Sequence, residues 1–306
     1  MNKQSSAVLL MAFGTPLSDD QLLPYYTDIR HGHAPSAAQV AALAARYRAI
    51  GGLSPLAKIT DQQVATVKNE LTSRGIDVPV ILGLSHTAPH IEEAVDRLAA
   101  TGVDVIYGVP LAAQYSSFNA RSYHDKAKAA LEKHPELHYV PVNDQGGSAA
   151  LIDYWANQLN KVKELISAPE TAVLFSAHSL PVRTREAGDP YKLNVEADVR
   201  AAAQLAYLSQ YWLGWQSAGK TGSKWIGPRF EDVAQQLIDD GAKHIVSVPL
   251  GFINNNLEIN YDVDIELRRI IEQAGAQLTR LPMPNADPAV ATTICDRLEA
   301  AGLTNQ

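Results

Sequence analysis

The sequence predicts an α/β protein built from two domains, each with a four-stranded parallel sheet flanked by helices. Short apolar runs alternate with helical patterns along the chain, which is typical of βαβ units. A length of 306 residues corresponds to two domains at roughly 150 residues each. Apolar residues make up 46% of the chain, which is enough to form a core in each domain.

Eight apolar runs are candidate strands, four in each half of the chain. Those of the first half span 7–13, 79–85, 103–111 and 138–142, and those of the second span 172–177, 213–216, 244–252 and 277–282. Helical patterns lie at 61–74, 90–100, 149–165, 195–207, 230–240, 264–274 and 288–301. We expect an N-terminal lobe at 1–148, a C-terminal lobe at 149–285, and a C-terminal helix at 286–306 that packs back on the N-terminal lobe.

The two halves resemble each other as an internal repeat. Residues 8–16 match residues 173–181 in their apolar pattern, a register that pairs Phe13 with His178, and 109–111 match 248–250. Ligands of open α/β sheets bind at the carboxyl ends of the strands. The repeat therefore predicts that Phe13 and His178 lie on opposing walls of one site, although two short apolar strands can also match by chance.

Composition and motifs exclude several classes of protein. The balance of 26 Lys and Arg against 33 Asp and Glu leaves a net charge of −7, which disfavours nucleic-acid binding. A single cysteine, Cys295, excludes an intrachain disulfide, a four-cysteine zinc site and a cysteine-bound iron–sulfur cluster. GxGxxG, GxxxxGK[ST] and GxSxG patterns are absent, so no organic cofactor is expected. No apolar run approaches the roughly 18 residues of a membrane span, and no signal-peptide cleavage site is found, so we expect a cytoplasmic protein without integral membrane association.

His178 is the first candidate for chemistry. It ends a strongly apolar strand in Phe175-Ser-Ala-His-Ser-Leu-Pro181, and the strand ends of α/β folds face the ligand. A neutral imidazole there can accept a proton or bind a metal. The alternative is a core histidine whose ring bonds a backbone carbonyl, and spacing alone leaves both readings open. Of the remaining histidines, only His86, at the end of a strand, is a second candidate.

Carboxylates recur every four residues at Glu258, Asp262 and Glu266. On a helix this spacing forms one line of negative charge, whose repulsion a hard divalent cation would relieve. For Asp262 and Glu266 alone, a solvent-facing stripe is the better explanation. Glu258 differs, because it follows an apolar strand and an asparagine-rich turn close to the predicted site.

Cationic and hydroxyl side chains near the first strand form a third group: Thr15, Arg30, Arg46, Tyr47 and Ser54. Arginine guanidinium groups pair well with carboxylates, so a cluster of them would bind an acidic substrate. Taken singly, these side chains are ordinary surface residues.

Several stretches of the chain together resemble the ferrochelatase family, nearest to the coproporphyrin ferrochelatases of Gram-positive bacteria. They lie at 9–16, 46–56, 175–181, 188–191 (Gly188-Asp-Pro-Tyr191), 214–217, 225–228, 248–252 and 257–262. They follow the order of the family over nearly the whole chain. No single stretch is specific to the ferrochelatase family, but the combination of all of them is.

The resemblance implies a chelatase-like fold of two Rossmann-like lobes with a porphyrin held between them. It also implies an enzyme that inserts Fe²⁺ into coproporphyrin III to give coprohaem in haem biosynthesis. His178 and Glu258 match the catalytic, metal-handling pair of the family. Porphyrin-binding positions are implied at Phe13, Thr15, Arg30, Arg46, Tyr47, Ser54 and Tyr123. Asp262 and Glu266 match an acidic line for a second divalent ion such as Mg²⁺.

Three features depart from the family pattern and keep alternatives open. Phe13 stands where relatives often carry a tyrosine that can approach the iron. Asn255 and Asn256 replace an Asp-His pair, and Ser85 replaces a basic residue. A non-catalytic porphyrin or haem carrier on the same fold therefore stays open, although a carrier would not need the catalytic pair. A protoporphyrin IX ferrochelatase, or a chelatase for another metal, stays open as well.

The implied partners are small molecules and one further protein. Fe²⁺ and coproporphyrin III are the substrates, so the iron is not a resident cofactor. A coprohaem decarboxylase is expected to receive the product. We expect a monomer that binds no nucleic acid.

Overall fold

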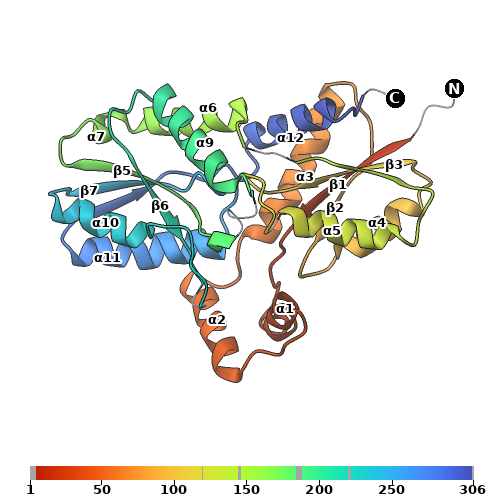
Figure 1. The fold of residues 1–306 in the computed structure, drawn as a ribbon, viewed down its shortest axis with the longest axis horizontal. Helices are drawn as coiled ribbons and strands as arrows, with labels where there is room; N and C mark the ends of the chain where they lie inside the picture. Colours follow the sequence, from red (N-terminus) through yellow and green to blue (C-terminus); the bar gives the residue numbers. More distant parts are fainter. Residues whose placement is uncertain (1–4, 119, 144–145, 184–187, 220–221, 305–306) are drawn as a thin grey trace. The chain divides into compact units, whose positions relative to one another are not determined.

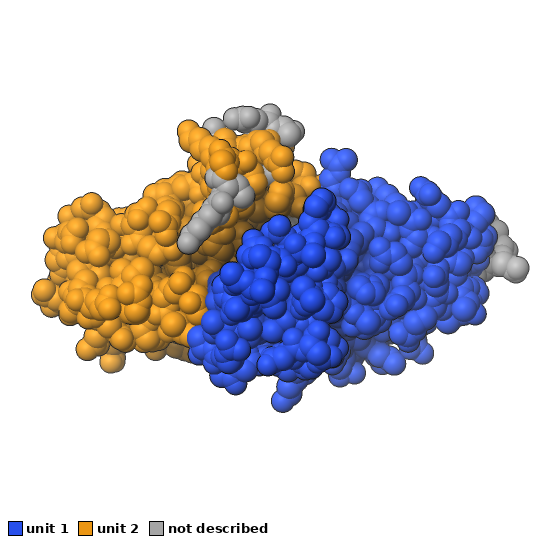
Figure 2. Space-filling view, turned by 90° about the horizontal axis from the view of Figure 1, so that it is seen from below, with its two compact units in different colours: residues 1–112, 119–145, 285–306 blue, residues 113–118, 146–284 orange. Residues whose placement is uncertain are grey.

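A computed structural model of the chain describes residues 5–118, 120–143, 146–183, 188–219 and 222–304. The chain divides into two compact units, which are coloured separately in Figure 2. Unit 1 comprises residues 1–112, 119–145 and 285–306, and unit 2 comprises residues 113–118 and 146–284. Relative to the expected lobe bounds, residues 113–118 and 146–148 cluster with the second unit and residue 285 with the first.

All eight expected strands form, four in each unit. They are β1 (Ser6–Ala12), β2 (Val80–Leu84), β3 (Val105–Pro110) and β4 (His138–Pro141) in unit 1, and β5 (Thr171–His178), β6 (Trp212–Gln216), β7 (His244–Val248) and β8 (Gln277–Arg280) in unit 2. The α/β fold class predicted from the sequence is confirmed.

Helices fill the connections between the strands. Those of unit 1 are α1 (Leu22–Ile29), α2 (Ala37–Ala49), α3 (Leu56–Ser73), α4 (Ile91–Ala99), α5 (Ala120–Leu131) and α12 (Pro288–Ala300), and a 3₁₀ helix at Asp19–Gln21 precedes α1. Those of unit 2 are α6 (Ala149–Lys161), α7 (Lys163–Ile166), α9 (Tyr191–Leu205), α10 (Phe230–Asp239) and α11 (Arg268–Gln273), and a π-helix at Ile259–Leu267 precedes α11. No helix in the described part of the chain is long and apolar enough to cross a membrane.

The sheet of unit 1 is parallel throughout, with the strand order β2-β1-β3-β4. All seven residues of the central strand β1 are buried, because helices pack over it. Its alternate side chains, such as Leu9 and Met11, pack with Ile91 of α4 and with residues of α5 in one hydrophobic cluster. This packing fixes the strand whose carboxyl end leads into α1.

The sheet of unit 2 has the same topology, with all strands parallel in the order β6-β5-β7-β8. The strand register is equivalent as well. Ser6 of β1 pairs with Val105 of β3, and Thr171 of β5 pairs with His244 of β7. These residues correspond in the repeat read from the sequence, so the two sheets are structural copies of each other.

The last helix, α12, belongs to unit 1 and packs against α3. Arg74, directly after α3, bonds Asp296 and Glu299 at 2.6 and 3.1 Å. The buried thiol of Cys295 lies 3.9 Å from the carbonyl oxygen of Val67 in α3. Ion pairs at Arg74 and the packing of Cys295 therefore hold α12 against α3.

Candidate active site

His178 is the last residue of β5, a central strand of the unit 2 sheet, and it is half-buried. Its Nδ1 lies 2.5 Å from the carbonyl oxygen of Ser179. Since a carbonyl oxygen only accepts, Nδ1 carries the proton and Nε2 is the basic nitrogen of the neutral ring. No residue of the described ranges hydrogen-bonds Nε2. The hydrogen bond to a backbone carbonyl that was expected of a core histidine is therefore present. The same bond fixes the tautomer that a base or a metal ligand requires.

Tyr191, at the start of α9, holds His178 in place. Its hydroxyl donates to the main-chain carbonyl of His178 at 3.0 Å. The tyrosine is itself fixed, because its backbone N–H donates to Asp189 at 2.8 Å and its ring lies 5.9 Å from the ring of Trp215. Burial raises the pKa of Tyr191, and the charge of Asp189 adds to the effect, so this hydroxyl remains a donor.

The loop that follows β7 passes close to the end of β5. The N–H of Gly251 donates to the carbonyl of Ser176 at 3.0 Å. A Cβ at Gly251 would lie 2.3 Å from the Cβ of Ala177, so this approach requires glycine. Phe252, the next residue, has its ring centroid 6.2 Å from that of His178. The loop is thus anchored against the strand end that carries the histidine.

Glu258 follows in the same loop, immediately before the π-helix, and is half-buried. The side chain of Asn256 accepts a hydrogen bond from the N–H of Ile259 at 2.9 Å and so stabilises the start of that helix. No described residue bonds the carboxylate of Glu258. Because the carboxyl ends of parallel strands meet at one edge of a sheet, the loop that leads to Glu258 leaves β7 at the edge of unit 2 where His178 ends β5.

The acidic residues that follow Glu258 differ in burial and in partners. Asp262 is buried, and its carboxylate accepts a hydrogen bond from the hydroxyl of Ser217. Glu266 is exposed. Among the described residues, no group of three or more His, Cys, Asp or Glu side chains is placed to hold a metal ion. Asp262 is thus a buried carboxylate with a hydroxyl partner, whereas Glu266 reaches solvent.

Phe13 directly follows β1, at the position that the internal repeat aligns with His178. Its side chain is 39% exposed. The ring lies 4.3 Å from the ring of His86 and 6.3 Å, edge to face, from that of Tyr25. A phenyl ring has no donor atom, so at this position unit 1 offers a ligand an apolar face.

Four of the side chains expected at the porphyrin are buried in unit 1. The hydroxyls of Thr15 and Tyr47 lie 3.2 Å apart and connect the end of β1 to α2. The hydroxyl of Ser54 accepts the N–H of Leu56 at 3.2 Å, at the start of α3. Tyr123, on α5, lies in the hydrophobic cluster and is only 7% exposed. The structure therefore places Tyr123 in the core, whereas the other three tie together the segments at the carboxyl edge of the sheet.

The two expected propionate-binding arginines lie at the end of α1 and in α2, helices that extend away from the unit 1 sheet in Figure 1. Arg30 follows α1, is half-buried, and donates from Nε to the carbonyl of His33 at 3.1 Å. Its guanidinium carbon lies 5.8 Å from the ring centroid of Tyr26. Arg46 lies in the last turn of α2 and is also half-buried. The helix pair thus carries two cations at the end of the sheet where ligands bind.

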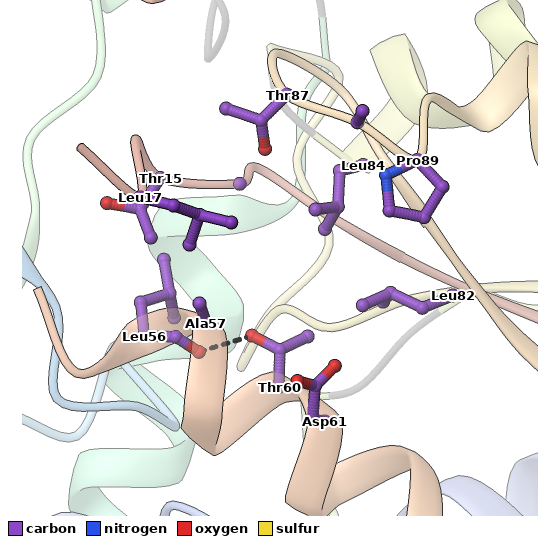
Figure 3. A pocket seen from close by; sticks show the side chains of 12 residues that line it. Thr15, Leu17, Leu56, Ala57, Thr60, Asp61, Leu82, Leu84, Thr87 and Pro89 are labelled. Atoms are coloured by element: carbon purple, nitrogen blue, oxygen red, sulfur yellow. Dashed lines mark hydrogen bonds between the residues drawn. The ribbon is translucent and has the colours of Figure 1, made fainter. Parts of the chain in front are cut away.

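Two cavities lie at this end of unit 1. The smaller, of about 170 Å³, has mainly apolar walls with the polar side chains of Thr15, Thr60, Asp61 and Thr87 among them (Figure 3). The larger, of about 380 Å³, is lined by Tyr25, Asp28, His86 and His90 among others. Its volume falls in the range of small-molecule sites, which are typically about 300–1,000 Å³.

Sequence reasoning did not find the partner of His86. The Nδ1 of His86 lies 2.5 Å from Oδ2 of Asp28, which comes from α1, 58 positions earlier in the chain. Burial lowers the pKa of His86, against the raising effect of Asp28. The sequence shows a histidine at a strand end, but no local pattern links it to a carboxylate on a distant helix.

Solved structures establish the class of fold. A structure of SirB from Bacillus subtilis with Fe³⁺ matches with a TM-score of 0.59 and 14% identity, and the match covers 97% of this chain and 95% of that one. CbiX, described as the terminal enzyme for biosynthesis of sirohaem in denitrifying bacteria, matches with a TM-score of 0.52 and 15% identity over 96% and 99% of the two chains. The chain therefore has a chelatase fold.

Sequence similarity establishes the family of the chain. A family model named Ferrochelatase matches residues 5–301. A coproporphyrin III ferrochelatase from Geobacillus thermodenitrificans is 39% identical over 312 residues, covering 99% of both chains. One of the same name from Listeria innocua is 39% identical over 287 residues, covering 92% of this chain and 93% of that one. The chain belongs to the ferrochelatase family, whose members are lyases that insert a metal ion into a porphyrin, and the resemblance inferred from the sequence is confirmed.

Proposed function

We propose that this chain inserts Fe²⁺ into coproporphyrin III to give coprohaem, and that a coprohaem decarboxylase takes up the product. Relatives named for coproporphyrin III cover nearly the whole chain. The observation that supports the proposal is the hydrogen bond between Nδ1 of His178 and the Ser179 carbonyl, which makes Nε2 the nitrogen with the lone pair in the neutral ring. A neutral imidazole at a strand end is the group that metal insertion needs.

Metal insertion requires two pyrrole protons to leave while Fe²⁺ loses water and enters a rigid ring. A planar ring hides its nitrogen lone pairs, so a site that bends the ring lowers the barrier. In our proposal Nε2 of His178 accepts a proton and transiently binds the iron. One nitrogen cannot do both at once, so the carboxylate of Glu258 acts beside it on the path of the proton or the metal.

Propionate recognition is assigned to Arg30 and Arg46. Coproporphyrin III carries four propionates and protoporphyrin IX carries two, so the number of satisfied carboxylates separates these substrates. Thr15, Tyr47 and Ser54 keep the surrounding segments in place through the bonds described above. A second divalent ion such as Mg²⁺ at Asp262 and Glu266 stays part of the proposal, with one oxygen of Asp262 held by the hydroxyl of Ser217.

The test mixes the purified protein anaerobically with Fe²⁺ and either coproporphyrin III or protoporphyrin IX. Metal entry quenches porphyrin fluorescence and shifts the absorption bands. The proposal predicts rapid quenching with coproporphyrin III and little with protoporphyrin IX. The reverse preference would change the substrate but keep the reaction. Tight binding without insertion of Fe²⁺, Co²⁺ or Zn²⁺ would instead support a carrier.

A further inference from the structure

A carboxylate–imidazole pair lines the larger cavity of unit 1 and has no part in the mechanism above. His86 comes two residues after β2, and its backbone N–H donates to the carbonyl of Phe13 at 3.1 Å. Its Nδ1 lies 2.5 Å from the carboxylate of Asp28. The imidazole is 13% exposed and the carboxylate is 46% exposed. The pair therefore joins a mostly buried imidazole to a carboxylate that reaches solvent.

The contacts of His86 fix both the tautomer and the orientation of its ring. A carboxylate only accepts, so Nδ1 carries the proton and Nε2 holds the lone pair of the neutral ring. The ring of Phe13 packs at 4.3 Å on one side of the imidazole. No residue in the described ranges hydrogen-bonds Nε2. In the catalytic triads of hydrolases, a carboxylate and an imidazole joined in this way act together as the general base.

Burial, rather than the surrounding charges, favours the neutral ring of His86. Asp28, on α1, stabilises the protonated form, whereas Lys126 of α5 and His31 after α1 oppose it. The ammonium group of Lys126 donates to the carbonyl of Ser85, so this positive charge is held beside the histidine. Burial is the largest effect, and it lowers the pKa of His86 below its ordinary value of about 6.5. At neutral pH His86 is therefore an unprotonated base.

We propose that His86 is a second proton acceptor in metal insertion and that Asp28 is its positioning residue. The proposal rests on the proposed function, because Phe13, which packs on His86, is one of the residues expected at the porphyrin. Two pyrrole N–H protons must leave the porphyrin, and His178 cannot accept both of them while it binds the iron. A pyrrole N–H proton passes to Nε2 of His86, and the nitrogen lone pair it leaves behind bonds the iron. Asp28 stabilises the imidazolium, which then returns the proton to water.

The experiment compares steady-state insertion of Fe²⁺ into coproporphyrin III by the wild-type chain, His86→Ala and Asp28→Asn. His86→Ala should lower kcat by about 100-fold, as for loss of a general base, with KM for the porphyrin changed by less than about threefold. Added imidazole should restore about tenfold of that loss, because the cavity has room for it. Asp28→Asn removes the group that raises the pKa of His86. The acid limb of its kcat profile should therefore move to lower pH.

A second histidine–carboxylate pair provides the matched control. His134 lies 2.7 Å from Asp96, and its side chain is 22% exposed. Neither residue lines the cavities described above, so His134→Ala and Asp96→Asn should keep wild-type kcat and pH profile. A purely structural role of His86 would predict equal losses from both pairs.

The outcomes separate this inference from the proposed function. A wild-type chain that inserts no metal refutes the function, and the inference with it. Near-normal kcat in His86→Ala with a working wild type refutes only the inference, as does the absence of imidazole rescue in a folded variant. If His86→Ala and His86→Gln both fail to fold, nitrogen NMR of the wild type decides: the inference requires the Nδ1–H tautomer of His86 at pH 7, and an Nε2–H tautomer or an imidazolium overturns it.

Discussion

The hydroxyl of Tyr191 donates a 3.0 Å hydrogen bond to the main-chain carbonyl of His178. The network extends further, because Asp189 accepts the N–H of Tyr191 and also both the N–H and the hydroxyl of Ser117. Ser117 lies in the 113–118 segment, which clusters with unit 2 although the chain on either side of it belongs to unit 1. The backbone position of the candidate base thus depends on a buried polar chain that reaches this segment.

Replacement of Tyr191 by phenylalanine tests that network. The variant leaves the carbonyl of His178 without its buried donor, which should lower the free energy of unfolding by about 1–2 kcal/mol. It should also lower kcat several-fold, since His178 loses a fixed orientation, while porphyrin affinity changes little. Urea unfolding and insertion kinetics measure the two effects.

Tyr154→Phe is the matched control for this variant. The hydroxyl of Tyr154 donates to the carbonyl of Pro282 at 3.1 Å, and the residue is also buried in unit 2. This variant should lose similar stability and keep wild-type kcat. Equal losses of kcat in the two variants would show that Tyr191 contributes only to general stability.

His178→Ala should abolish metal insertion while leaving porphyrin binding largely intact. The reason is that Nε2 of His178 is the proposed proton acceptor and iron ligand, whereas the propionates are assigned to arginines of unit 1. Fluorescence quenching with Fe²⁺ measures insertion, and fluorescence titration without metal measures binding. His138→Ala, at the exposed start of β4, is the control and should behave as wild type. Near-normal turnover by the His178 variant would refute its assigned role.

Gly251→Ala tests the approach of the β7 loop to β5. The added Cβ would lie 2.3 Å from Cβ and 2.6 Å from Cα of Ala177, so one backbone segment must move. Overpacking of this kind costs about 1–3 kcal/mol, and the displaced loop should reduce kcat because it carries Glu258. Gly222→Ala, where no atom lies within 4 Å of the added Cβ, should change neither stability nor kcat. Wild-type stability and turnover in Gly251→Ala would show that the loop tolerates the extra methyl group.

Much of the fold could be predicted because its strands are buried and therefore uniformly apolar. The seven buried residues of β1 are an example, and the repeat between β1 and β5 is visible in the sequence for the same reason. Helices α1 and α2 were not predicted. In α2 only Tyr47 is buried among 13 residues, so there is no apolar stripe to detect. α1 is eight residues long and contains Pro24, which obscures its helical pattern.

The site was predictable only where a residue stands at the end of a strand. Phe13 and His178 satisfy that condition, and their positions follow from topology alone. The Asp28–His86 pair does not, because its carboxylate comes from α1, and no local rule brings α1 to β2. The family resemblance implies a porphyrin-binding role for Tyr123, and that role stays a prediction; its burial depends on the packing of α5 against the sheet, which the sequence does not reveal.

The buried thiol of Cys295 should lower the stability of unit 1 at alkaline pH. Burial raises the pKa of the Cys295 thiol to about 12, whereas a thiol in an unfolded chain titrates near about 8.5. Above about pH 8.5 the unfolded chain loses this proton and the folded chain keeps it, so the free energy of unfolding falls as pH rises toward 12. One such group contributes a slope of at most about 1.4 kcal/mol per pH unit.

Urea unfolding of the wild type and of Cys295→Ala from pH 7 to 10.5 measures this contribution. Burial also raises the pKa of Tyr139 and Tyr191, which act in the same direction in both proteins. The wild-type curve should therefore fall more steeply than that of the variant above about pH 8.5, and the two should run parallel below it. A constant offset between the curves over the whole range would reflect only the cavity left by the removed sulfur, and would show that the thiol does not titrate differently in the folded and unfolded chains.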